Sequence, residues 1–428
     1  MLSVSISALL LILALSIPIA AGLVLLSMLL AWVYSPMPLS LAFGGLAWST
    51  ASESTLFAIP LYIMLGELLL RGGISERMYN AIAQWLSWLP GGLMHANVGF
   101  STMFAAMSGS SVACAATLGT VSNPLIKKYR YNERLFLGTI AAGGALGILI
   151  PPSIPLIIYG VITETSIPQL YLAGFIPGFV LAALFSFTVM VACLFRPAWG
   201  GDPIATDWRT RFALLPDLIP PLLVFFVVIG AIYLGWATPT ESAALGVLMA
   251  LALAAWRRRV TFRMILEAGE ATVITTSMIT LIVVAAFLLN FVVTAIGLSQ
   301  QVTELFARSG LSPTELILAI IVFYLILGMF MESLSMLIAT VPLIMPTVIA
   351  AGIDKVWFGI LMMILMEAAL LTPPIGINLF VVQGTRESGP VKDVIIGAIP
   401  FVITMMLMAL LLVAFPDQAL WLPRVLGD

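Results

Sequence analysis

Two long runs of this sequence are apolar enough to lie in lipid and yet carry helix-breaking residues. Residues 92–126 contain no formal charge, but Ser-Gly-Ser-Ser at 108–111 stands at the middle of the run, where small residues permit a chain reversal. The next run, 135–163, is interrupted by Pro151-Pro152, which removes two amide donors and disfavours the helical conformation in the preceding residue. Unpaired backbone groups are tolerated at membrane depth where they are buried in protein or line a cavity. We therefore expect a re-entrant hairpin followed by a broken helix whose freed backbone groups face a ligand.

Composition places the whole chain in the membrane. Hydrophobic residues make up 61% of the 428 positions and charged residues 9%, which is typical of a multi-pass, all-α membrane protein. About 20 residues are needed for each crossing, so the length allows about ten crossings. The net charge of -2 and the lack of any basic run longer than 257–259 argue against a nucleic-acid partner. Both cysteines lie in apolar runs, and we expect them to be buried hydrophobes rather than a disulfide.

The uncharged runs predict nine spans and two hairpins. The spans lie near 8–33, 55–71, 135–160, 170–195, 214–235, 241–256, 271–296, 358–382 and 395–415, and the hairpins at 92–126 and 315–350. Most Lys and Arg residues of the short loops then fall on one side, which we predict to be cytoplasmic. The opposite connections, 34–54, 163–169 and 236–240, contain almost no cations. Amphipathic segments at 75–89 and 299–308 predict helices lying in the membrane interface.

The pattern of breaks occurs twice. Pro151-Pro152 and Pro373-Pro374 are 222 residues apart, and Gly73-Ile74-Ser75 precedes the similar Gly297-Leu298-Ser299 by 224 residues. Because the intervening number of predicted crossings is odd, the second copy should be inverted. Inverted repeats with a broken helix in each half indicate a secondary transporter. The competing explanation is that glycine and proline are simply common in membrane helices.

These patterns predict inverted repeats with two re-entrant helical hairpins and two broken helices, and they divide the chain into five parts. The predicted parts are scaffold spans with an interfacial arm at 1–90, the first hairpin and broken helix at 91–163, scaffold and connecting spans with a second arm at 164–313, the second hairpin and broken helix at 314–385, and a last span at 386–428.

Broken membrane helices offer ligands for both ions and anions. Sodium prefers oxygen ligands, which unwound carbonyls supply, while half-helix N-termini attract anions. Expected sodium ligands are Ser110, Ser111, Gly147, Ile150 and Pro152 in the first half, and Gly328, Ser333, Thr372 and Pro374 in the second. Expected substrate contacts are Ser108, Gly109, Ser153, Glu332, Ser335 and Asn378. The alternative for the serines is close helix packing, and for Asn378 a structural cap.

Ionisable residues within spans need separate treatment because they are costly in a membrane. Glu332 and Glu367 are predicted to coordinate an ion or to carry a proton. Glu164 and Glu241 stand at span ends beside Thr and Ser, where a helix-capping role explains them. Glu67 and Arg71 predict an ordinary i,i+4 pair near the interface. The midplane stretches otherwise contain no Lys or Arg, so an anion there would be balanced by helix N-termini, hydroxyls and bound sodium.

Several motifs together resemble one transporter family. They are SGSSVA from Ser108, GILIPPSIPLIIYG from Gly147, TETSI from Thr163 with AGFIPG from Ala173, TPTE from Thr238, GMFME from Gly328 and LTPPIGINLFV from Leu371. They are similar to motifs of the large, DctM-type membrane subunit of tripartite ATP-independent periplasmic (TRAP) transporters. Glu332 stands where aspartate is as common in that family.

The resemblance implies a sodium-driven elevator mechanism in a bacterial inner membrane. It also implies a small four-helix membrane subunit, and a periplasmic substrate-binding protein that delivers an organic anion, such as a C4-dicarboxylate, a sialic acid or a sulfonate.

Two other functions remain open from the sequence. An autonomous sodium-coupled dicarboxylate carrier would share the inverted repeat and need no binding protein. An intramembrane serine hydrolase would pair Ser110 with His95, the only histidine. A helix between them would separate the pair by roughly 22 Å, which is beyond hydrogen-bond reach.

Overall fold

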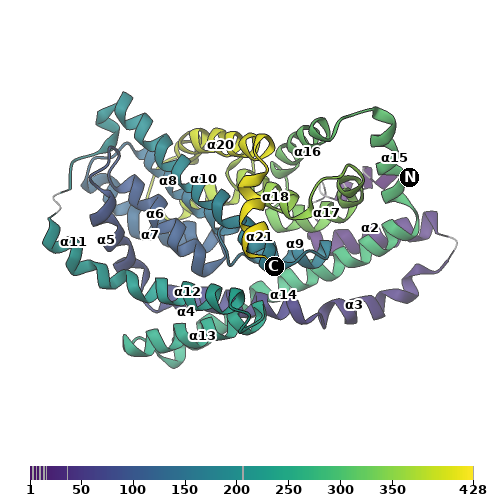
Figure 1. The fold of residues 1–428 in the computed structure, drawn as a ribbon, viewed down its shortest axis with the longest axis horizontal. Coiled ribbons are helices and arrows are strands. Elements are labelled where there is room, and N and C mark those ends of the chain that lie inside the picture. The colour runs from purple at the N-terminus through teal and green to yellow at the C-terminus, as the bar shows by residue number, and fades with distance from the viewer. Residues whose placement is uncertain are drawn as a thin grey trace.

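The chain folds into a helical bundle in which α9 (Ile154–Thr163), α10 (Ile167–Phe195) and α18 (Lys355–Leu371) lie near the middle of the view, with α20 (Val391–Ala414) along the upper edge (Figure 1). The computed structural model describes residues 17–35, 37–204 and 207–427, together with 1, 4–5, 7–8, 11–12 and 15. The described residues form helices, turns and connections without any strand, which confirms the all-α prediction. Part of the predicted first span, 8–33, lies outside the described residues. Its remainder is α2, Ile19–Tyr34.

The two halves share one order of elements, each containing a first helix, a short amphipathic helix, a helix pair, an interrupted helix and a long last helix. The first half contains α4 (Ala58–Arg71), α5 (Ser75–Leu86), α6 (Leu93–Ser108), α7 (Ser111–Lys128), α8 (Glu133–Ala145), α9 (Ile154–Thr163) and α10 (Ile167–Phe195). The second contains α14 (Phe262–Ala295), α15 (Leu298–Ser309), α16 (Pro313–Gly328), α17 (Ser333–Ala350), α18 (Lys355–Leu371), α19 (Ile377–Gly384) and α20 (Val391–Ala414). Between the halves lie α11 (Trp208–Leu214), α12 (Ile219–Tyr233) and α13 (Pro239–Trp256). Both interrupted helices break at a Pro-Pro pair, as predicted, and both pairs have a cis peptide bond.

Polar side chains fix where several helices begin. Thr238 and Glu241 form a capping box at the start of α13, which confirms the capping role predicted for Glu241. Ser312 and Glu315 form the same box at α16. The capping prediction for Glu164 is wrong: this residue follows α9 in the left-handed conformation, with φ +53°, and ends a helix instead of starting one.

Three further elements differ from the predicted spans. The predicted connection 34–54 contains a helix, α3 (Phe43–Ala51), and α21 (Asp417–Leu426) follows the last span. Helix α14 begins nine residues before the predicted start because Thr261 caps it by accepting a hydrogen bond from the amide of Met264 at 3.1 Å. Its 34 residues span about 51 Å at 1.5 Å per residue, more than the hydrocarbon core requires.

Among the described residues, seven helices are long and apolar enough to cross a membrane. One of them, Ser333–Ala350, belongs to the second predicted hairpin. The multi-pass prediction is therefore confirmed, whereas nine crossings and the re-entrant depth of the hairpins stay predictions.

The loops gather into two separate groups. Arg77 and Arg257, from two loops predicted to be cytoplasmic, both pair with Asp217, at 3.6 and 3.4 Å. On the opposite side, the end of α12 meets the start of α10, since the hydroxyl of Tyr233 donates to the carbonyl of Pro168 at 2.9 Å. This grouping agrees with the loop assignment made from the positive charges.

Each interrupted helix crosses into the other half. Helix α9 packs on α17, and α19 packs on α7. Helix α18 is buried from Val356 to Leu371. These contacts bring the two helix-pair tips and the two breaks together at the centre of the molecule.

Candidate transport site

The first tip is a tight reversal between α6 and α7. Gly109 takes the left-handed conformation, φ +57°, which costs glycine little. A Cβ atom at this position would lie 2.8 Å from the carbonyl oxygen of Pro152. The side chain of Ser110 caps α7, accepting a hydrogen bond from the amide of Ala113 at 3.3 Å. The tip therefore rests directly on the first break.

The first break is compact, and several of its polar groups form hydrogen bonds within the break itself. After α8, the chain makes a 3₁₀ turn at Leu146–Ile148 and resumes as a helix at Ile154. Ser153 caps α9, accepting from the amide of Leu156 at 3.4 Å, and its hydroxyl donates to the carbonyl of Ile148. A Cβ atom on Gly147 would lie 3.0 Å from the amide nitrogen of Ser111. The backbones of the tip and of the break are thus in contact.

The second tip is organised by a carboxylate. Glu332 caps α17, and its two oxygens accept hydrogen bonds from the amides of Leu334 and Ser335, each at 3.0 Å. The hydroxyl of Ser335 donates to the same group at 3.1 Å. The hydroxyl of Ser333 donates to the carbonyl of Met366 at 3.2 Å, which joins the tip to α18. Glu332 therefore holds the tip together, whatever else it binds.

The second break lies between Leu371 and Ile377. The hydroxyl of Thr372 donates to the carbonyl of Ala368 at 2.7 Å. Asn378 is fully buried, and its amide donates to the carbonyl of Ala141 on α8 at 3.4 Å. Its side-chain oxygen has no hydrogen-bond partner in the described part of the chain. Asn378 thus connects the second break to the first interrupted helix.

A central cavity of about 480 Å³ lies between the two tips. It brings together six of the predicted site residues: Ser108, Gly109, Ser110, Ser111, Glu332 and Ser333. The remaining predicted residues do not line this cavity: Gly147, Ile150, Pro152, Ser153, Gly328, Ser335, Thr372, Pro374 and Asn378. Helix α4 and helix α14 form the opposite wall, through residues such as Gly66 and Thr275.

Sequence reasoning missed the charged pair on that wall. Glu67 and Arg71 form an ion pair, as expected, but both line the central cavity. The guanidinium of Arg71 also lies 3.8 Å from Glu267 of α14. A cation therefore does border the site, contrary to the expectation that only dipoles and bound ions would balance an anion. The available signal was the neighbouring Gly66, whose Cβ would lie 3.2 Å from the Cα of Ser108 and which lets α4 approach the tip.

Glu367 lies apart from the central cavity. It is fully buried in α18, and neither carboxylate oxygen has a hydrogen-bond partner in the described part of the chain. An unpaired buried carboxylate is costly unless it is neutralised. Its predicted role as an ion or proton carrier stays a prediction.

The comparisons with known proteins identify the family. The profile described as "Tripartite ATP-independent periplasmic transporter, DctM component" matches residues 6–418. The sialic acid TRAP transporter large permease protein SiaM of Vibrio cholerae is 33% identical over 372 residues, covering 87% of this chain and 86% of that protein. The chain belongs to the DctM family of TRAP transporters.

Other similarities agree with this assignment. The C4-dicarboxylate TRAP transporter large permease protein DctM of Vibrio cholerae is 29% identical, covering 96% of this chain and 94% of that protein. Among solved structures, the Alcanivorax borkumensis YdaH transporter superposes with a TM-score of 0.70, covering 95% of this chain and 98% of that chain, at 13% identity. That structural likeness concerns the fold alone.

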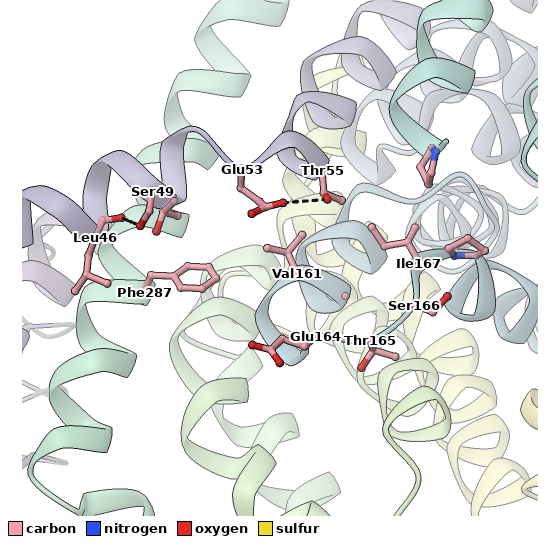
Figure 2. A pocket seen from close by; sticks show the side chains of 14 residues that line it. Leu46, Ser49, Glu53, Thr55, Val161, Glu164, Thr165, Ser166, Ile167 and Phe287 are labelled. Atoms are coloured by element: carbon pink, nitrogen blue, oxygen red, sulfur yellow. Dashed lines mark hydrogen bonds between the residues drawn. The ribbon is translucent and has the colours of Figure 1, made fainter. Parts of the chain in front are cut away.

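A second cavity of the TRAP subunit, of about 650 Å³, lies among connections that we expect outside the cytoplasm. Figure 2 shows Glu53 and Glu164 from two different segments bordering it, with Phe287 of α14 on one wall and Val161 of α9 between them. Glu53 accepts a hydrogen bond from the hydroxyl of Thr55 at 3.3 Å. Its lining contains carboxylates and hydroxyls but no Lys or Arg among the described residues.

The geometry of the TRAP subunit does not form a Ser-His pair. His95 lies at the start of α6 and Ser110 beyond its far end. The Nε2 atom of His95 is 2.8 Å from the carbonyl oxygen of Pro90, while Ser110 caps α7. The family is one of transporter permeases, so the chain is not assigned an enzymatic reaction.

Proposed function

We propose that this chain is the sodium-coupled large subunit of a TRAP transporter that imports an organic anion across a bacterial inner membrane. The observation that carries the proposal is the contact between paired tips and paired breaks. At each break a membrane helix is interrupted, and a tip made of small and polar residues packs against it. Interrupted helices present carbonyl groups to cations and amide groups to anions at the same depth.

The expected sodium ligands support two ion sites. The first would use oxygens of Ser110, Ser111 and the Gly147–Pro152 backbone, and the second those of Ser333, Thr372 and the adjacent carbonyls. A hard cation in either position would draw a tip and a break together. Sodium would thereby complete the wall of the central cavity and favour binding of an anion there.

The substrate class is inferred from relatives and from Arg71. Relatives are named as permeases for sialic acid and for C4-dicarboxylates, both of which carry carboxylates. In this chain, Arg71 lines the central cavity and presents a planar donor group suited to a carboxylate. Competition from Glu67 would keep that binding weak until the substrate displaces the internal partner.

The moving part would comprise α6–α9 and α16–α19. Helices α9 and α17, like α7 and α19, pack across the two halves, so these elements are suited to moving as one body. Helices α4 and α14, which pack on each other and form the opposite wall, would belong to the scaffold. An elevator movement would carry the central cavity along this wall.

The family implies two partners, a small membrane subunit and a periplasmic substrate-binding protein. We propose that the binding protein docks over the acidic outer cavity and releases substrate there. The alternative, an autonomous carrier, would need this chain to capture dilute substrate unaided.

Uptake by proteoliposomes containing this chain, its small subunit and the binding protein tests the proposal. We expect uptake to require an inward sodium gradient and no ATP. Uptake that is unchanged when potassium replaces sodium would refute sodium coupling. Full uptake without the binding protein would favour the autonomous carrier.

A further inference from the structure

Three cavities follow one another along helix α14, and α4 lines the central and the inner one. Moving from the outer loops inward, α14 contributes Phe287 to the outer cavity, Thr275 and Ile279 to the central cavity, and Glu267 to a third. From one cavity to the next, the nearest contributions of α14 lie eight residues apart, or about 12 Å along the helix. The third cavity, of about 580 Å³, is therefore the inner end of the same path.

The third cavity is rich in arginine. It lies where α4 and α13 end and α14 begins, and its charged lining consists of Arg71, Arg258, Arg259, Arg263 and Glu267. Arg71 also lines the central cavity, so a single side chain connects the two. We call this third cavity the arginine pocket.

The internal ion pairs leave part of this charge uncompensated. Glu267 binds Arg263 at 2.7 Å, and Arg71 pairs with Glu67 and lies 3.8 Å from Glu267. Arg258 and Arg259 form no ion pair with any described residue, and both are exposed. The N-terminus of the 34-residue helix α14, at Thr261 and Met264, adds its positive dipole end to the same cavity.

We propose that the arginine pocket is the inner exit of the transport path and transiently binds the carboxylate of the released substrate. This inference rests on the proposed function. Charged side chains change along the path in the order that suits an inward-moving anion. The outer cavity has two carboxylates, the central cavity has two carboxylates and one arginine, and the arginine pocket has four arginines and one carboxylate.

The physical advantage lies in the release step. An anion leaving the central cavity must separate from bound sodium and from Arg71. A cationic pocket one or two helical turns away lowers the free-energy barrier to release of the anion. The positive potentials of several arginines add up, and a concave surface strengthens the sum. Arg71, with access to both cavities, can keep contact with the carboxylate during the transfer.

The simpler explanation is that these arginines only set membrane orientation, or that they hold a lipid phosphate. Neither explanation requires Arg71 to border both cavities. Each explanation predicts a result for transport that differs from the result expected for an exit site, so the experiments below include a condition that tests each one.

The first experiment uses the complete complex in vesicles, with the binding protein added outside. The double variant Arg258→Gln/Arg259→Gln removes two charges that touch neither the central cavity nor another charge. The control, Lys127→Gln/Lys128→Gln, removes two adjacent cations at the end of α7 that we also expect at the cytoplasmic side, where Lys127 lies 3.8 Å from the exposed Glu387. We expect the arginine variant to lower maximal uptake roughly three- to tenfold, with unchanged half-saturation for the binding protein, and the control to resemble wild type.

Two conditions separate electrostatic release from other roles. Potassium chloride inside phosphatidylcholine vesicles should slow the wild type and leave the arginine variant unaffected, since about 0.1 M salt screens charges beyond about 10 Å. Equal losses in both double variants, or no loss, would overturn the proposal. A loss confined to vesicles that contain phosphatidylglycerol would assign the pocket to lipid and would also overturn it.

A second measurement does not depend on transport. Succinate, used as a dicarboxylate probe, should protect Arg258 and Arg259 from phenylglyoxal, while Arg130 on another loop stays reactive. Potassium chloride at equal ionic strength should protect less. Absence of protection would refute the anion site even if sodium-driven uptake is observed, and protection would support the site even if sodium coupling fails.

Discussion

Gly138 of α8 lies in direct backbone contact with Gly397 of α20. A Cβ atom on Gly138 would overlap the carbonyl oxygen of Gly397, and one on Gly397 would overlap the carbonyl of Arg134. Helix α8 belongs to the first half of the chain and α20 to the second. Two glycines therefore permit the closest approach between the first interrupted helix and the last long helix, as small residues do at membrane helix interfaces.

Substituting one of these glycines should destabilise the subunit. We expect Gly397→Ala to cost about 1–3 kcal/mol, because the overlapping atom is backbone and can relieve the clash only if a helix shifts. Gly269→Ala, inside α14 with open space around it, serves as the control and should be neutral or slightly stabilising. Thermal melting of the purified complex compares the two. An unchanged melting temperature for Gly397→Ala would show that the two helices separate without cost.

Gly109 at the first tip offers a sharper test of the transport site. Gly109→Ala adds both a left-handed strain of about 1–2 kcal/mol and a contact with the carbonyl of Pro152. Gly235→Ala introduces the same strain, φ +70°, in open space. We therefore expect uptake to fall strongly for Gly109→Ala and to change little for Gly235→Ala. Equal uptake by the two variants would show that the first tip is not part of the transport site.

Much of this fold follows from local chemistry. Helices break at Pro151-Pro152 and Pro373-Pro374, where two adjacent prolines remove two amide donors, whereas single prolines such as Pro177 lie inside continuous helices. The Ser-Gly-Ser-Ser segment reverses the chain because glycine and serine suit a turn and a helix cap. Those effects act within a few residues. The breaks, the tips and the repeated order of elements were consequently predictable from the sequence alone.

Other features depend on distant packing or on weak local signals. Glu67 and Arg71 look like an ordinary surface pair until α4 is placed against the first tip. Glu164 adopts a left-handed conformation that is uncommon for a glutamate. Helix α3, nine residues long, is too short for a hydropathy pattern to predict.

The double substitution Pro151→Ala/Pro152→Ala tests whether the interruption itself matters. Alanine restores the amide donors and favours a continuous helix, so fewer carbonyls would remain for a cation. We expect the protein to insert normally while half-saturation by sodium rises and uptake falls. Normal uptake with unchanged sodium dependence would show that the broken helix is not the ion site.

The role of Glu332 as the cap of α17 can be tested separately from a role of its negative charge in binding sodium. Glu332→Ala removes the acceptor for two amides and should cost about 1 kcal/mol as a lost helix cap. Glu332→Gln keeps an oxygen acceptor but removes the negative charge from the central cavity. If the charge helps to bind sodium, Glu332→Gln should weaken sodium dependence while it preserves the melting temperature better than Glu332→Ala does. Sodium dependence equal to wild type in Glu332→Gln would leave the residue with a capping role alone.

Docking of the binding protein should depend on the outer loops. Charge reversal at Asp354 or Lys355 is a poor test, because Asp354 caps α18 and the ammonium of Lys355 donates to the carbonyl of Thr163 at 3.1 Å. Changing either residue would alter the fold as well as the surface. Glu164 is exposed, borders the outer cavity and forms no ion pair with any described residue, so Glu164→Lys is the cleaner reversal.

We expect Glu164→Lys to raise the concentration of binding protein needed for half-maximal uptake, and to leave insertion and sodium dependence unchanged. Surface charges act mainly on the rate of encounter between partners, so the effect should shrink as salt increases. Glu387→Lys, at the exposed end that we assign to the cytoplasm, is the matched control and should behave as wild type. Uptake that responds equally to both reversals, or that persists at dilute substrate without the binding protein, would contradict docking at the outer cavity.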